Sequence, residues 1–233
     1  MPHAHGRANR PSIGMVNVTV TMIENPWRDL AFSYAPDHAR GALKTLFALD
    51  AALGDVLRTT REPMVGQMRL AWWREALQRL DAAPPPGEPV LQGLAAAVLP
   101  LGVTGATLAD MVNGWEPLLG DVGEAAIDDH ARFRGRALFE AAARVTDAAP
   151  SDPVATAGEG WALADLAGNL SDGDRAERTR ERAVATFAGI NAVRWSRQGR
   201  ALGALALVAR RRLDGPVPAS FVFRLGRFRL IGR

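Results

Sequence analysis

The fold class is decided by residues 36–80, which read PDHARGALKTLFALDAALGDVLRTTREPMVGQMRLAWWREALQRL. Apolar side chains recur there every three or four residues, as at Leu43, Leu46 and Phe47, and this spacing is typical of one face of an α-helix. The pair Glu62-Pro63 interrupts the pattern with a proline suited to the first turn of a new helix. The stretch therefore predicts two helices, over residues 36–60 and 62–80.

In the second of these helices, apolar residues four apart define the expected buried face: Met64, Met68, Trp72, Ala76 and Leu80. Trp72 is therefore expected in the core. Trp73 is offset from it by about 100° around the helix axis. We expect Trp73 to pack on a neighbouring helix or to line a cavity.

The remaining sequence continues the helical pattern after a Pro-rich break at residues 82–87. Thr104 and Asp152 are suitable N-caps. Further helices are expected over residues 88–99, 104–119, 128–146, 152–170, 173–189, 191–213 and 218–230. No convincing pair of strands and no internal repeat is visible. The sequence predicts an all-α, single-domain helical bundle, in which a cavity between facing helices is the usual place for a site.

The composition of the chain excludes several classes of protein and of metal site. The chain has 233 residues, 48% of them hydrophobic, which is enough for a buried core and excludes a disordered protein. It has no cysteine, so thiol chemistry and Cys-ligated zinc or iron–sulfur sites are excluded. Of its histidines, His3 and His5 fall in the N-terminal segment, which leaves His38 and His130. A multi-histidine metal site in the body of the domain is therefore excluded.

Positive and negative charges are distributed unevenly along the chain. Residues 1–192 carry a net charge of −6, whereas residues 193–233 carry +9, and all the basic residues of the second segment are arginines. Aromatic residues such as Trp195 and Phe223 interleave with these arginines, a pattern typical of a segment that meets an anionic membrane surface. Ion pairs with the acidic part of the chain are an open alternative. Nucleic-acid binding is disfavoured, because no recognised motif accompanies the arginines.

Three segments are expected from these patterns. Residues 1–21 lack the apolar region of a signal peptide and are expected to be a disordered tail or an over-extended start. Residues 22–213 form the all-α domain, and residues 214–233 form a basic amphipathic C-terminal segment. The longest apolar run, residues 201–209, is too short to span a bilayer. We expect a cytoplasmic protein, peripheral at the inner membrane.

A family resemblance rests on particular motifs: LAFSYAP at 30–36 with Arg40, residues 42–50, Glu62-Pro63, MRLAWWREAL at 68–77, and a weaker echo at 157–175. In these motifs the chain resembles the squalene/phytoene synthase family. It is most similar to the divergent bacterial members and to the mitochondrial relative that helps assemble respiratory complex I. The resemblance implies the all-α isoprenoid-synthase fold. It also implies descent from enzymes that join two prenyl diphosphates head to head.

That reaction depends on paired Asp-x-x-x-Asp motifs. Carboxylates one turn apart on two facing helices hold Mg²⁺ ions, which neutralise the departing diphosphate. In this chain the first motif's aspartates correspond to Gly54 and Arg58, and the second motif's to Asn169 and Gly173. An arginine cannot ligate magnesium. The resemblance therefore implies a member that has lost Mg-dependent prenyl transfer, has no metal or cofactor, and acts as a binding or assembly accessory protein at the membrane.

The alternative is an active head-to-head prenyl diphosphate synthase that uses Mg²⁺. Its catalytic acids would be the carboxylates remaining near the two motifs: Asp50, Asp55, Asp165 and Asp172. A third possibility is a helical binding protein with no connection to isoprenoids. It applies if the resemblance at Trp72-Trp73 is accidental.

Candidate substrate-binding residues follow from the same motifs: Tyr34, Arg40, Arg69, Trp73 and Arg74. A guanidinium group matches the oxygens of a phosphate, so Arg69 and Arg74 fit an anionic ligand. Pairing of these arginines with local carboxylates is the alternative. The expected partners are an anionic membrane surface or a membrane-associated protein, together with a prenyl or other lipid ligand, and no nucleic acid.

Overall fold

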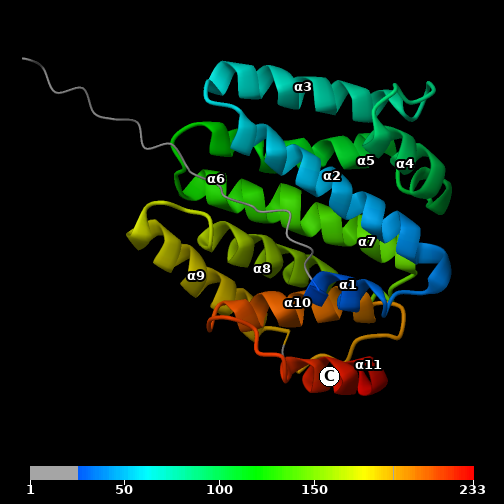
Figure 1. Cartoon of the computed structure of the whole chain (residues 1–233), viewed down its shortest axis with the longest axis vertical. Coiled ribbons are helices and arrows are strands. Elements are labelled where there is room, and N and C mark those ends of the chain that lie inside the picture. The colour runs from blue at the N-terminus through cyan, green and yellow to red at the C-terminus, as the bar shows by residue number, and fades with distance from the viewer. Residues whose placement is uncertain (1–25, 191) are drawn as a thin grey trace, which may run out of the picture.

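The computed structural model describes residues 26–190 and 192–233. Within these ranges the chain forms helices and connecting turns and contains no strand, which confirms the all-α prediction (Figure 1). The expected tail at residues 1–21, with His3 and His5, lies outside the described residues. None of the described helices is both long enough and apolar enough to cross a membrane.

The α-helices are α1 Pro26–Phe32, α2 Arg40–Thr59, α3 Pro63–Arg79, α4 Pro89–Ala97, α5 Gly105–Ala109, α6 Glu124–Asp129, α7 Ala137–Thr146, α8 Val154–Ala167, α9 Gly173–Ala188, α10 Arg200–Arg212 and α11 Phe221–Ile231. A π-helical turn, His130–Arg136, joins α6 to α7 in one continuous rod. Short 3₁₀ turns connect several of the others.

The helices are stacked from α3 at one end of the molecule to α11 at the other (Figure 1). Helix α2 contacts α3, α4 and α7, and helix α8 contacts α7, α9 and α10. A continuous apolar core runs through these layers, from Leu43 and Leu70 near one end to Leu202 and Leu225 near the other. Helices α2, α7 and α8 therefore pass through the middle of the bundle, where a site would be enclosed.

Local sequence explains several helix ends. Pro63 and Pro89 stand in the first turns of α3 and α4, and the Thr104 hydroxyl caps α5 by accepting from the Thr107 amide at 3.1 Å. Asp152 does not cap α8 as expected. Its carboxylate accepts from the Ser196 amide at 2.7 Å and ties the start of α8 to the turn before α10.

The predicted buried face of α3 is wrong for Met64, Met68 and Trp72, whereas Ala76 and Leu80 are buried as expected. Trp72 is 46% exposed, and Met64 and Met68 are more exposed still, whereas Leu70 and Trp73 are buried. Helix α3 carries apolar side chains on both sides and lies at the edge of the bundle (Figure 1), so only one side can be covered. Periodicity alone could not indicate which side that is.

Other differences concern helix boundaries. A separate helix at α1 was not predicted, and the helix expected from residue 191 begins only at Arg200. The residues before Arg200 form turns in which the Trp195 amide donates to the Gly232 carbonyl at 2.8 Å. This bond pairs the turn with the end of α11, which a periodic pattern cannot reveal.

Candidate functional site

A buried arginine occupies the middle of the bundle. Arg134, in the π-helical turn between α6 and α7, donates from Nε and Nη2 to the two carboxylate oxygens of Asp50 on α2, at 2.8 and 3.0 Å. Its Nη1 donates to Oδ2 of Asp165 on α8 at 2.6 Å. Two of the four acids singled out from the sequence therefore meet, and they meet around a guanidinium group.

Aromatic rings cover both faces of this guanidinium. Its carbon lies 4.3 Å from the ring centre of Trp115 and 4.6 Å from that of Trp161. His130, one turn before Arg134, accepts from Arg134 Nη1 through Nε2 at 3.0 Å and donates from Nδ1 to the Gly114 carbonyl at 2.7 Å. The carbonyl fixes the tautomer, since only a protonated Nδ1 can donate to it. We call these six residues the Arg134 cluster: Asp50, Trp115, His130, Arg134, Trp161 and Asp165.

Glycines bring the backbones of the cluster close together. A Cβ atom on Gly158 of α8 would lie 2.2 Å from the carbonyl oxygen of Gly135, and a Cβ on Gly135 would lie equally close to that of Gly158. A Cβ on Gly114 would lie 2.5 Å from the backbone nitrogen of Arg134. Only glycine allows these approaches, which set Arg134 within reach of Asp165.

The charges in the cluster depend on one another. Burial, reinforced by the positive charge of Arg134, lowers the pKa of His130 to about 3, so its imidazole is neutral. Burial alone would raise the pKa of Asp165, but the charge and hydrogen bond of Arg134 outweigh it and the pKa lies below its ordinary value. Burial likewise acts to lower the pKa of Arg134, and Asp50 and Asp165 overcome this effect and raise it. The guanidinium thus remains charged.

The chain matches a known protein family. The family model described as squalene/phytoene synthase matches residues 28–157, more than half of the chain. The chain belongs to the squalene/phytoene synthase family. Comparisons with curated proteins and with solved structures gave no match. The matched part of this squalene/phytoene synthase family member includes Asp50 and Arg134 and ends before Asp165.

The family chemistry requires Mg²⁺, and the residues of this member do not fit it. Both oxygens of Asp50 and one of Asp165 are taken by Arg134. Arg58, which the family resemblance aligns with an aspartate of the first motif, is largely buried, and its charge interacts with these same two acids. Among residues 26–190 and 192–233, no group of three acidic or histidine side chains could hold a metal ion. The carboxylates of Asp50 and Asp165 are therefore neutralised by arginine side chains.

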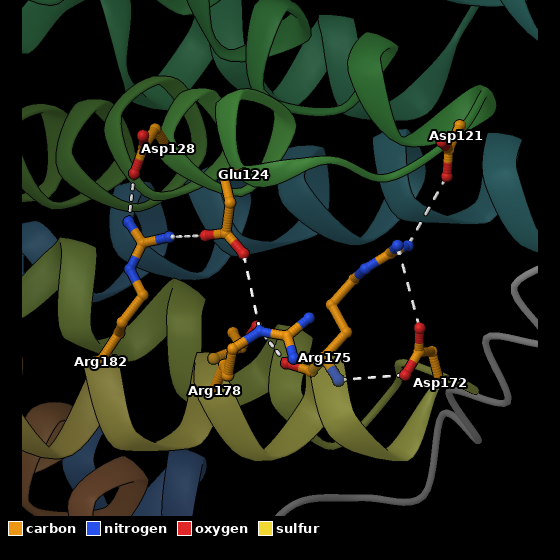
Figure 2. Close-up of polar contacts among 8 residues, drawn as sticks. Asp121, Glu124, Asp128, Asp172, Arg175, Arg178 and Arg182 are labelled. Carbon is orange, nitrogen blue, oxygen red and sulfur yellow. Dashed lines mark hydrogen bonds and ion pairs between the residues drawn. The ribbon is translucent and has the colours of Figure 1, made fainter.

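The other two candidate acids lie apart from the cluster. Asp55 forms an ion pair with Arg58 on the same helix. Asp172 caps α9 by accepting from the Arg175 amide at 3.1 Å, and its carboxylate lies 3.8 Å from Arg175 Nη2 (Figure 2). Both carboxylates therefore have local partners near the protein surface. Asp50, in contrast, is buried, and the Asp165 side chain is 37% exposed.

Helix α9 is also held by an ion-pair network shown in Figure 2. Arg182 Nη1 lies 3.0 Å from Glu124, and Arg182 also pairs with Asp128; Arg175 lies 3.7 Å from Asp121. Arginines of α9 thus face the acids of α6 and of the loop before it. In this network, the acidic side chains pair with arginines of α9 and not with arginines of the basic region 193–233.

The candidate substrate-binding arginines have protein partners. Arg40 donates to the carbonyl oxygens of Ser33 and Ala35 and pairs with Asp37 at 2.9 Å, so it organises the turn between α1 and α2. Arg69 Nη1 donates to the hydroxyls of Thr59 and Thr60, both at 2.8 Å. These contacts join the end of α2 to α3.

The other three candidates lie in different surroundings. Arg74 Nη2 donates to Asn113 at 2.9 Å and to Glu116 at 2.6 Å. Tyr34 is buried, with its ring 5.2 Å from the guanidinium of Arg229 on α11. Trp73 is buried and packs edge-to-face on Trp72. Each of the three therefore packs on or pairs with other protein groups.

Rings fill the space beside the cluster. Phe47 packs against Trp161 with ring centres 5.6 Å apart, and Phe139 packs against both. A pocket of about 390 Å³ remains between α8, α9 and α10. Both positions of the second motif, Asn169 and Gly173, line it, together with Asp165. The pocket adjoins the cluster through Asp165 and Trp161.

Arg134, Trp115 and Trp161 were not predicted as site residues from the sequence. A signal for Arg134 existed, because it lies four residues after His130 and four before Leu138, on the apolar face of the helix over residues 124–146. A charged residue on such a face must find a buried partner. The two tryptophans carry no comparable signal, since an apolar residue in a helix is ordinarily core.

Proposed function

We propose that this family member no longer carries out magnesium-dependent prenyl transfer and acts as a binding or assembly accessory protein at a membrane. The observation that supports this most strongly is the Arg134 guanidinium bonded to Asp50 and Asp165. In catalytic members, metal ions between facing acids neutralise the diphosphate leaving group. Here a cation that belongs to the chain binds Asp50 and Asp165, the acids that remain close to the two motif positions.

Arg134 cannot replace the metal in the reaction. It makes four hydrogen bonds to protein groups, and tryptophans cover both of its faces. A metal ion has open coordination positions for diphosphate oxygens, whereas this guanidinium has one N–H left and no open face. The allylic carbocation would therefore form without electrostatic support for its leaving group.

We extend the proposal to a ligand. The pocket of about 390 Å³ has the size of a small-molecule site, and alanines and Trp161 make up part of its wall. Its charged residues balance, with Asp165 and Glu177 against Arg180 and Arg212. Such a pocket suits the apolar chain of a prenyl or other lipid ligand better than a diphosphate.

The test is a turnover assay with purified protein, Mg²⁺ and radiolabelled farnesyl or geranylgeranyl diphosphate. An active enzyme of the family serves as the positive control. We expect neither diphosphate release nor a triterpene or tetraterpene hydrocarbon. Turnover that is lost in Asp50→Asn and Asp165→Asn would overturn the proposal and establish the active synthase in its place.

A further inference from the structure

The C-terminal helix α11 has one buried and one exposed apolar face. Phe221, Leu225 and Phe228 are buried in the core. On the outside, Phe223 is 79% exposed, Leu230 is 76% exposed, and Val222 is also exposed. At about 100° per residue, these exposed side chains fall within an arc of about 100°, with Arg227 on one side of it and Arg229 on the other. We call these three exposed residues the apolar stripe.

A pocket of about 380 Å³ lies beside the apolar stripe, between α9, α10 and α11. Apolar side chains line it, among them Trp195, Phe187 and Phe228. Its other lining residues include one acid, Asp214, and a set of arginines: Arg210, Arg211, Arg224, Arg227 and Arg233. The pocket thus combines an apolar lining with strong positive charge.

Most of this charge is not neutralised within the described chain. Asp214 pairs with Arg210 at 2.9 Å. Within residues 26–190 and 192–233, none of the ion pairs includes Arg211, Arg224, Arg227 or Arg233. Five arginines around a single acid leave an excess of positive charge, which attracts an anion with several oxygens, such as a phosphate.

We propose that α11 and this pocket form a surface that binds phosphate headgroups of anionic phospholipids in a bilayer. The apolar stripe enters the lipid boundary, and the arginines beside it meet the phosphates. Arg227 lies next to the apolar stripe and also lines the pocket. One orientation of α11 on the bilayer therefore places the stripe in the lipid and the arginines at the phosphates. The inference rests on the membrane part of the proposed function and is independent of the loss of metal.

A bilayer fits better than a nucleic acid. The phosphates of RNA or DNA would satisfy the arginines and leave Phe223 and Leu230 in water, 79% and 76% exposed. A lipid surface covers these side chains and supplies the anions together. Charge complementarity and the exposed stripe therefore point to the same occupant.

The experiment measures binding of the full chain to phosphatidylcholine vesicles with and without phosphatidylglycerol. Two double variants test the surface: Arg224→Gln with Arg227→Gln, and Phe223→Ser with Leu230→Ser. The matched control is Met64→Ser with Met68→Ser, which removes exposed apolar side chains from α3 at the opposite end of the molecule (Figure 1). Circular dichroism confirms that each variant is folded.

We expect binding only to vesicles with phosphatidylglycerol. The charge variant should bind about thirtyfold more weakly, since each arginine near an anionic surface is worth roughly fivefold. The stripe variant should also bind more weakly, and the α3 control should bind like the wild type. Equal binding to both vesicle types, unchanged binding of both α11 variants, or complete displacement by millimolar glycerol phosphate would overturn the proposal. None of these outcomes bears on prenyl transfer, which the turnover assay measures separately.

Discussion

Removal of the Arg134 side chain tests how much the cluster depends on its cation. Arg134→Met keeps much of the volume and apolar contact between Trp115 and Trp161 but removes the charge. Asp50 and Asp165 are then left facing each other without their shared partner. Breaking a buried ion pair by removing one partner costs about 3 to 5 kcal/mol. For a chain of this size, that loss lowers the melting temperature by on the order of 10 °C.

Thermal unfolding at neutral pH, followed by circular dichroism, measures the effect. Arg136→Met is the matched control, because Arg136 lies on the same helical rod, is half exposed and pairs with Glu140 on the surface. An exposed pair is worth about 0 to 1 kcal/mol, so the control should melt close to the wild type. Equal melting of Arg134→Met and the wild type would refute the view that Arg134 holds the cluster together.

The same variant has a second expected property. Without the guanidinium, the two carboxylates repel each other, and a divalent cation can relieve that repulsion. Millimolar Mg²⁺ should therefore raise the melting temperature of Arg134→Met and leave that of the wild type unchanged. If Mg²⁺ raises the melting temperatures of the variant and the wild type equally, it does not bind to these two carboxylates.

Two other perturbations address the surroundings of the cluster. The pKa of His130 is about 3 in the fold against about 6.5 unfolded, so its contribution to stability is complete above pH 6.5 and is lost as the pH falls towards 3, by about 1.4 kcal/mol per pH unit. Chemical denaturation over this range measures the free energy of unfolding, which should depend less on pH in His130→Gln than in the control His38→Gln. Equal pH dependence in the two variants would contradict a buried, neutral His130. Gly158→Ala places a Cβ against Gly135 and should lower stability by several kcal/mol, whereas Gly173→Ala, with open space around it, should be neutral or slightly stabilising. Similar melting of both alanine variants would mean that α8 can move away without cost.

The sequence predicted the helices well, because their apolar spacing and proline starts are local properties. Helices α2, α3 and α9 lie close to where the pattern placed them. The first half of the α3 face was predicted wrongly because Met68 and Leu70 are both apolar. Which of them is buried depends on the position of α3 at the edge of the bundle, and that is a tertiary property.

The candidate site was predicted only in part. The family resemblance placed Gly54 and Arg58 where acids are expected, and Asp50 and Asp165 were named as remaining acids. Their common partner was not found, since Arg134 lies 84 residues from Asp50 and 31 from Asp165. No local pattern joins such distant residues. Only the packing of α2, the π-helical turn and α8 brings them together.

In the proposed function, Arg134 occupies the carboxylates that a metal ion would need. Titration of the wild-type protein with Mn²⁺, followed by electron paramagnetic resonance of the free ion, tests it most directly. We expect no saturable site at micromolar to millimolar concentrations. A saturable site that disappears in both Asp50→Asn and Asp165→Asn would contradict the account.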